Sequence, residues 1–135
     1  MIKFENRFDE YAYRVSSLPL AATAKVEEGQ WVTIKDGEVV LANGTTDKKA
    51  FLAIGSNREG RDQVAGRIVR KISFLVGDFM LTVSNFDTGK SYSSMSPLKV
   101  NETGNLTLSE SPGTDTVVAY ALGAPVNGFL RIVSA

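Results

Sequence analysis

Glycine placement is the feature of this 135-residue sequence that most restricts its fold. All 12 glycines lie between Gly29 and Gly128, and consecutive glycines are 5 to 15 residues apart. Runs of β-branched and aromatic residues fill the intervals, and such punctuation is typical of short strands joined by turns. The spacing predicts a mainly β protein, an all-β sandwich or barrel, that follows an N-terminal arm.

The clearest predicted hairpin surrounds Asp36 and Gly37. Residues 31–35 and 38–42 are rich in apolar and β-branched side chains. The Asp-Gly pair between them tolerates the positive φ angles that a two-residue type I′ turn needs. In the first strand, Val32 and Ile34 are expected to face the core.

Further strands are predicted where apolar runs end at Gly, Pro or Asn. These runs are residues 50–54, 64–75, 79–83, 98–101, 106–110, 116–122 and 129–133. In the run at 79–83, Phe79, Leu81 and Val83 are expected to face the core. Residues 76–78 are interpreted as a turn, and 85–95 as a long loop or a weak edge strand. Arg70 interrupts the apolar face of its run, which predicts a bulge or break near Val69, or a guanidinium that reaches a subunit contact.

Residues 1–20 differ from the rest because they lack glycine and concentrate aromatic side chains. Phe4, Phe8, Tyr11 and Val15 follow helical spacing, which allows a short amphipathic helix. The alternative is an extended arm, since no good N-cap precedes the segment. In either form the segment is a candidate docking arm. Its candidate contact residues are Ile2, Phe4, Phe8, Tyr11 and Tyr13.

The absence of His and Cys removes several kinds of chemistry. A Ser-His-Asp triad, a Cys-His pair and the usual zinc sites all need these residues. Adjacent carboxylates at Asp9-Glu10 and Glu27-Glu28 point in different directions and do not make an acid–base pair by themselves. We therefore expect no enzymatic activity, no cofactor and no metal site.

Membrane and export signals are also missing from the sequence. The longest uncharged stretch, residues 116–130, contains Gly and Pro and is too short for a spanning helix. The charged N-terminal residues do not resemble a signal peptide. We expect no membrane partner and a protein that works where it is made.

Charge is unevenly distributed beneath a net charge of zero. Residues 55–75 carry five Lys or Arg and two Asp or Glu, a balance of +3. The segment lacks the interleaved aromatics of nucleic-acid binders, so no nucleic-acid partner is expected. The alternatives are a solvated strand face or docking on an acidic protein surface. The candidate docking residues here are Arg58, Arg61, Arg67 and Arg70.

Trp31 alternates with Val32 and Ile34 along its predicted strand. If those two residues face the core, the indole faces outward, where an exposed aromatic can anchor an interface. The alternative is that it packs beneath the N-terminal arm. Trp31 is thus a further candidate interface residue.

Two stretches resemble tailed-phage capsid decoration (cement) proteins. Residues 25–34 (KVEEGQWVTI) and 36–42 (DGEVVLA) are similar to the opening hairpin of that family. Residues 117–122 (VVAYAL) and 129–133 (FLRIV), with the glycine-containing turn between them, resemble its closing hairpin. With the turns inside them, these stretches cover about a quarter of the chain.

The resemblance implies a β-rich homotrimer on the outer surface of an expanded phage head, where it would bridge major capsid protein subunits. The expected fold is a small barrel or tulip-like β domain at residues 21–135, and the protein would be made in the cytoplasm of its host. By position, residues 1–20 correspond to a terminal arm that lies across the shell. Two alternatives remain. The chain could be a virion-appendage module that binds glycan through Trp31 and the Ser/Thr-rich loop at 85–96, or an enzyme acting through carboxylates or Tyr.

Overall fold

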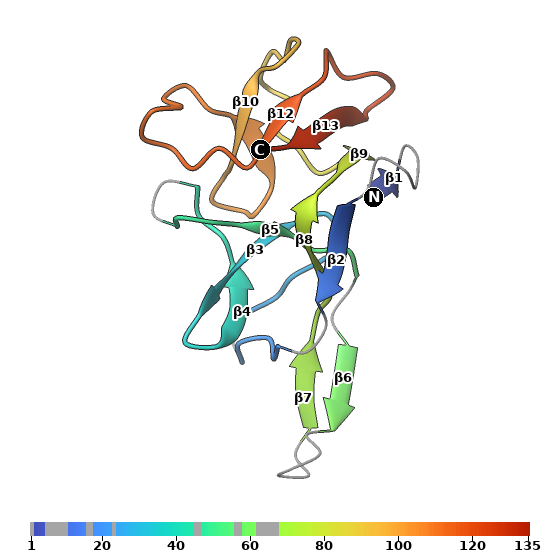
Figure 1. Ribbon diagram of the computed structural model, residues 1–135, viewed down its shortest axis with the longest axis vertical. Helices are drawn as coiled ribbons and strands as arrows, with labels where there is room; N and C mark the ends of the chain where they lie inside the picture. Colours follow the sequence, from blue (N-terminus) through green and yellow to red (C-terminus); the bar gives the residue numbers. More distant parts are fainter. Residues whose placement is uncertain are drawn as a thin grey trace.

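The computed structural model describes residues 2–4, 11–15, 18–22, 24–44, 47–55, 58–61 and 68–135. Every regular element in these ranges is a strand (Figure 1). The strands are β1 (Ile2–Phe4), β2 (Tyr11–Val15), β3 (Trp31–Lys35), β4 (Glu38–Leu41), β5 (Phe51–Leu52), β6 (Arg58–Arg61), β7 (Ile68–Lys71), β8 (Phe74–Asp78), β9 (Met80–Val83), β10 (Pro97–Val100), β11 (Leu106–Leu108), β12 (Ala119–Ala121) and β13 (Leu130–Ser134).

The mainly β class is confirmed, but the described strands do not close into a barrel. They form one sheet of six strands in the order β1-β9-β13-β12-β10-β11, a three-stranded sheet β4-β3-β5, and the pairs β2-β8 and β6-β7. All ladder pairs in the six-stranded sheet are antiparallel. Within the described ranges no helix is long and apolar enough to cross a membrane.

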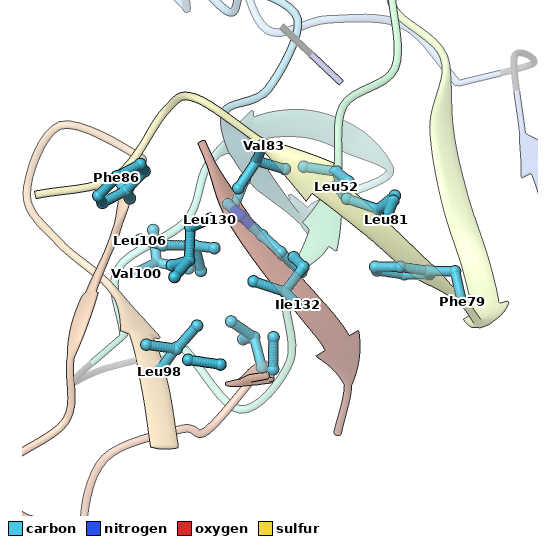
Figure 2. Close-up of a cluster of buried hydrophobic side chains, with 14 of the residues drawn as sticks. Leu52, Phe79, Leu81, Val83, Phe86, Leu98, Val100, Leu106, Leu130 and Ile132 are labelled. Atoms are coloured by element: carbon cyan, nitrogen blue, oxygen red, sulfur yellow. The ribbon is translucent and has the colours of Figure 1, made fainter. Parts of the chain in front are cut away.

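The main hydrophobic core lies on the inner face of the six-stranded sheet. Figure 2 shows Leu81 and Val83 of β9 and Leu130 and Ile132 of β13 directed into one cluster, where all four are fully buried. This result confirms the predicted inward face of the strand at 79–83. It follows from strand alternation, since the residues between them, Thr82 and Arg131, are more exposed.

A second core lies on the far side of β3, β5 and β8. Adjacent residues on these strands enter different clusters: Trp31 and Leu75 belong to the main core, whereas Val32 and Phe74 belong to the second. The rings of Phe51 and Phe74 lie 5.2 Å apart between their centroids in the second cluster. The central strands are therefore covered on both faces, as strands in layered β proteins often are.

The hairpin around Asp36-Gly37 forms as predicted. Asp36 and Gly37 have φ angles of 52° and 76°, and β3 and β4 pair antiparallel from Lys35↔Glu38 outward. Both positive angles agree with a type I′ turn. Val32 is fully buried as expected, but the expectation for Ile34 is wrong, since its side chain is 38% exposed. Val39, directly opposite on β4, is fully buried because Leu20 pairs with it and shares its cluster, which does not include Ile34.

The run predicted at 64–75 is divided at a different place from the one expected. The strand β7 ends at Lys71 and β8 begins at Phe74, so the described break lies at residues 72–73 and not near Val69. The chain changes partner here, from β6 to β2. Ile72 and Ser73 are both buried at this junction, which ends the alternation that a single half-buried strand requires.

The turn predicted at residues 76–78 is wrong. These residues complete β8, because their backbone pairs with Tyr11, Ala12 and Tyr13 of β2. At Phe79, immediately before β9, the chain passes from the β2-β8 pair into the six-stranded sheet. The hairpin predicted near the C-terminus is confirmed by the antiparallel pairing of β12 with β13.

Candidate interaction surfaces

The described part of the N-terminal segment is extended and not helical. Ile2–Phe4 pairs with β9 at one edge of the six-stranded sheet, and Tyr11–Val15 pairs with β8 in a different sheet. A helix is thus wrong for these residues, while an arm that leaves the domain is not confirmed. Strands are favoured at these residues because they form backbone hydrogen bonds with β9 and β8, whereas a short isolated helix is only marginally stable.

The five candidate arm residues are not gathered into one site. Ile2 is partly buried and packs against the main core. Phe4 lies in β1, and Tyr11 and Tyr13 lie in β2, where the structure describes their backbone alone. Phe8 lies outside the described residues. The backbone places β1 and β2 as the outermost strands of their sheets.

Trp31 is a core residue, which corrects the expectation of an outward indole. Its side chain is only 2% exposed and belongs to the main cluster. The alternation argument failed because β3 is covered on both faces. Its indole Nε1 is buried and has no hydrogen-bond partner among the described residues. With the indole enclosed, it does not offer the stacking surface required by the glycan alternative.

The four candidate arginines have different outcomes. Arg70 donates from its guanidinium to the carbonyl oxygens of Ala21 and Ala22, at 2.8 and 2.7 Å. The guanidinium thus holds a segment of its own chain. Arg58 and Arg61 lie in β6, where only the backbone is described, and Arg67 lies outside the described residues.

The β6–β7 ribbon extends from the end of the molecule opposite the six-stranded sheet (Figure 1). Its register places Arg58 opposite Lys71 and Glu59 opposite Arg70. Like charges at directly opposed positions disfavour a strand pair. Three positive residues, Arg58, Arg70 and Lys71, and one negative residue, Glu59, thus lie at the end of the ribbon that joins the body of the molecule.

The loop between β9 and β10 is ordered by Asp87 and Tyr92. The buried Tyr92 hydroxyl donates to the carbonyl oxygen of Asp87, and the Asp87 carboxylate accepts from Gly89 N and Thr107 Oγ1. Burial, followed by the nearby Asp87 charge, raises the pKa of Tyr92 to about 12, although a hydrogen bond with Thr107 opposes the rise. Of the two alternatives predicted for residues 85–95, the long loop is the one observed, and Tyr92 anchors it.

No arrangement suited to acid–base or metal chemistry emerges from the described residues. They contain no group of three or more His, Cys, Asp or Glu that could hold a metal ion. Of three surface hollows, the first has Asp78 as its carboxylate side chain and the second has Glu102. The third is lined by Arg131 and has no carboxylate side chain. None of these three brings two carboxylate side chains together.

An apolar row lies on the outer face of the six-stranded sheet and was not predicted from the sequence. Four directly opposed residues, all half-buried, cross four strands. They are Met80, Val133, Tyr120 and Pro97. Each of these four residues alternates with core residues along its own strand. The row is therefore recognised only from the pairing register of the four strands.

Next to this row the turn between β12 and β13 projects Val126, which is 68% exposed. Val126 and Phe129 exchange backbone hydrogen bonds of 2.9 and 3.0 Å across Asn127 and Gly128, whose φ angles are 52° and 79°. This geometry is a second type I′ turn. The Asn-Gly pair is its sequence signal, and that signal would have predicted the turn.

A hollow of about 350 Å³ lies between this turn and the sheet. Leu122, Ala124, Val126 and Phe129 supply its apolar lining, with Thr82 of β9 and Arg131 of β13 beside them.

Comparison of the chain with protein families, with curated proteins and with solved structures gave no match.

Proposed function

We propose that this chain is a capsid decoration protein of a tailed phage. It binds the outer surface of the expanded head and stabilises contacts between major capsid protein subunits, without acting as an enzyme. The proposed assembly on the head is a homotrimer. The proposal rests on the resemblance of the two hairpins and on the placement of the N-terminal segment.

The observation that carries most weight is the position of β1 and β2. The resemblance assigns shell contacts to residues 1–20, and the described strands of this segment are outermost in two different sheets. Outermost strands have backbone donors and acceptors directed away from their own sheet. An extended segment of a capsid subunit could pair with such an edge by strand addition.

The two hairpins that carry the resemblance also support the proposal. Residues 31–41 and 119–134 contain the antiparallel pairs β3–β4 and β12–β13. Both pairs contribute to buried clusters, with Val39 in one and Ile132 in the other. The resembling residues thus belong to the buried framework of the molecule, whereas β1 and β2 pair with β9 and β8.

Binding to undecorated heads tests the proposal directly. Expanded heads that lack this protein are mixed with the full chain, pelleted, and examined by electron microscopy for density at local threefold positions. Saturable binding with threefold density is expected, together with greater resistance of the decorated heads to heating. Failure of the full chain to bind would overturn the proposed function.

The role of the N-terminal segment is tested by a chain that lacks residues 1–9. This deletion removes β1 but keeps β2, whose Val15 packs against the second core. Thermal unfolding establishes that the shortened chain is folded. Weaker head binding is expected, whereas undiminished binding by the folded variant would exclude β1 as a contact.

A further inference from the structure

We propose that Asn127 is a site of spontaneous deamidation, at which the side-chain amide is converted to the carboxyl group of aspartate or isoaspartate. The reaction uses water and needs neither an enzyme nor a cofactor, so the inference goes beyond the proposed function and does not depend on it. The argument compares three pairs of residues that differ in chemistry or in enclosure. These are Asn127-Gly128, Asn43-Gly44 and Asp36-Gly37.

The chemistry depends on the glycine that follows the asparagine. Hydroxide removes the proton of the Gly128 amide, and the nitrogen then forms a bond with Cγ of Asn127. The Cγ–Nδ2 bond breaks, ammonia leaves after taking a proton from water, and a five-membered succinimide ring remains. Water opens this ring at either carbonyl carbon, which gives aspartate or isoaspartate. Glycine favours the attack because it has no Cβ to crowd the approach of its nitrogen.

The Asn127-Gly128 pair is open to water at the tip of the hairpin between β12 and β13. Both residues are exposed. The backbone hydrogen bonds that close the turn join Val126 and Phe129 and do not use the Gly128 amide. No described residue accepts a hydrogen bond from that amide. The nitrogen that must lose its proton is therefore in contact with solvent.

The position of the turn also makes it easy to open. Ring closure requires rotation about the Cα–C bond of Asn127, which the type I′ geometry restricts. The ladder between β12 and β13 ends at Ala121↔Ile132, and the tip beyond it is closed by the isolated bridge Val126↔Phe129. Exposed hairpin ends open at a much lower free-energy cost than the core of a fold. Local opening of the tip therefore allows the rotation without unfolding the sheet.

The pair Asn43-Gly44 has the same chemistry but is enclosed. Gly44 is buried, and its amide donates to the carbonyl oxygen of Val100 at 3.0 Å. Asn43 is half-buried and is held on both sides by Asp47: its amide donates to the Asp47 carboxylate at 2.6 Å, and its carbonyl oxygen accepts from Asp47 N at 2.9 Å. Reaction here requires separation of this segment from β10, which is a larger opening than that of a hairpin tip.

The pair Asp36-Gly37 has the same turn geometry but different chemistry. Its φ angles of 52° and 76° are close to the 52° and 79° of Asn127 and Gly128, and both residues are exposed. An ionised carboxylate is a much poorer electrophile than an amide, so isoaspartate should form slowly at Asp36. The turn also indicates the effect of each product at position 127. Aspartate should preserve the turn, whereas isoaspartate adds a methylene group to the backbone and should disturb it.

The test follows all three pairs in the full chain during incubation in mildly alkaline buffer. Peptide mass spectrometry with fragmentation that distinguishes aspartate from isoaspartate measures the products, and released ammonia is measured in the same samples. Asn127 should lose its amide at least about tenfold faster than Asn43, and isoaspartate should form more slowly at Asp36 than at Asn127. In urea, where the unfolded chain exposes both Asn-Gly pairs, Asn127 and Asn43 should react at similar rates.

A variant adds an independent measurement. Asn127→Asp should release less ammonia than the natural chain and should keep its melting temperature. A lower melting temperature would overturn the expectation that aspartate preserves the turn. If Asn43 reacts as fast as Asn127 in the folded chain, exposure does not select the site and the inference fails. It also fails if Asn127 reacts in urea but stays intact in the folded chain, because the closed turn then protects it.

Discussion

The indole ring of Trp31 lies 6.2 Å from the phenyl ring of Phe79, measured between centroids, at an angle of 38°. This contact joins the three-stranded sheet to the residue that precedes β9. Aromatic pairs at such distances stabilise a fold beyond the effect of buried area alone. The contact explains why the single tryptophan lies inside the molecule.

Replacing Trp31 by Ala should lower the free energy of unfolding by about 3–5 kcal/mol, because the substitution leaves a large cavity in the main core. Trp31→Phe should cost less, since it removes an indole N–H that has no described partner while keeping an aromatic ring. Urea denaturation measures both changes. Ile34→Ala on the same strand is the control, and a loss below about 1 kcal/mol for Trp31→Ala would contradict the packing argument.

Replacing Arg70 by Met should cost about 1.5–3 kcal/mol, because the guanidinium loses its two hydrogen bonds to Ala21 O and Ala22 O. Methionine keeps most of the aliphatic stem, so the loss reports on the guanidinium. Hydrogen exchange should show faster exchange of the Leu20 and Ala21 amides, which donate to Arg70 O and Val39 O.

The neighbouring substitution Lys71→Met removes one positive charge as well and serves as the control for Arg70→Met. It should leave those two amides protected. Equal exchange rates in the two variants would show that charge, and not the guanidinium contacts, stabilises the segment at residues 20–22.

Tyr92 predicts a loss of stability at high pH. Its pKa is raised to about 12 in the folded protein, chiefly by burial, whereas an unfolded tyrosine ionises near 10. The protonated phenol is favoured in both states below pH 10, so the stability from this group is complete there. It is lost progressively between pH 10 and 12 as the unfolded chain releases the proton first.

A rise of about two pKa units corresponds to at most roughly 2.7 kcal/mol. Because solvent screens part of this effect, the expected loss of stability is about 1–2 kcal/mol. Thermal unfolding across this pH range measures it. Tyr92→Phe should be less stable at neutral pH, because the hydrogen bond to Asp87 O is lost, but should show a flatter decline above pH 10. A parallel decline in both proteins would assign the alkaline loss to other groups.

Gly44 should not tolerate Ala. A Cβ there would lie 2.5 Å from Val100 O and 2.8 Å from Val100 N, and backbone atoms cannot move aside as a side-chain end can. We expect a loss of more than about 2 kcal/mol, in the range of other overpacking substitutions. Gly113→Ala, where no atom lies within 4 Å of the added carbon, should be nearly neutral in the same melting experiment.

Local signals predicted much of this fold. The Asp36-Gly37 turn, the inward face of residues 79–83 and the closing hairpin all depend on neighbours in the sequence, so their patterns are visible without the structure. The burial of Trp31 depends instead on sheets brought together from distant parts of the chain. Alternation separates the two faces of a strand, but it does not tell whether one or both are covered.

The candidate surfaces were predicted less well for the same reason. The aromatic spacing of residues 1–20 fits a helix, yet β8 and β9 provide backbone partners that favour strands at residues 2–4 and 11–15. The row containing Tyr120 arises only from the alignment of four strands. Arg70 was recognised as unusual, but its acceptors Ala21 and Ala22 lie 48 or more residues away.

The strand β8 has a mechanical consequence for the whole molecule. Its successive residues Phe74 and Leu75 enter the two separate cores, so one strand fastens both. A force applied to either core reaches the other through this shared strand. Unfolding one core under force would therefore also remove β8 side chains from the other core. We expect the two cores to unfold together.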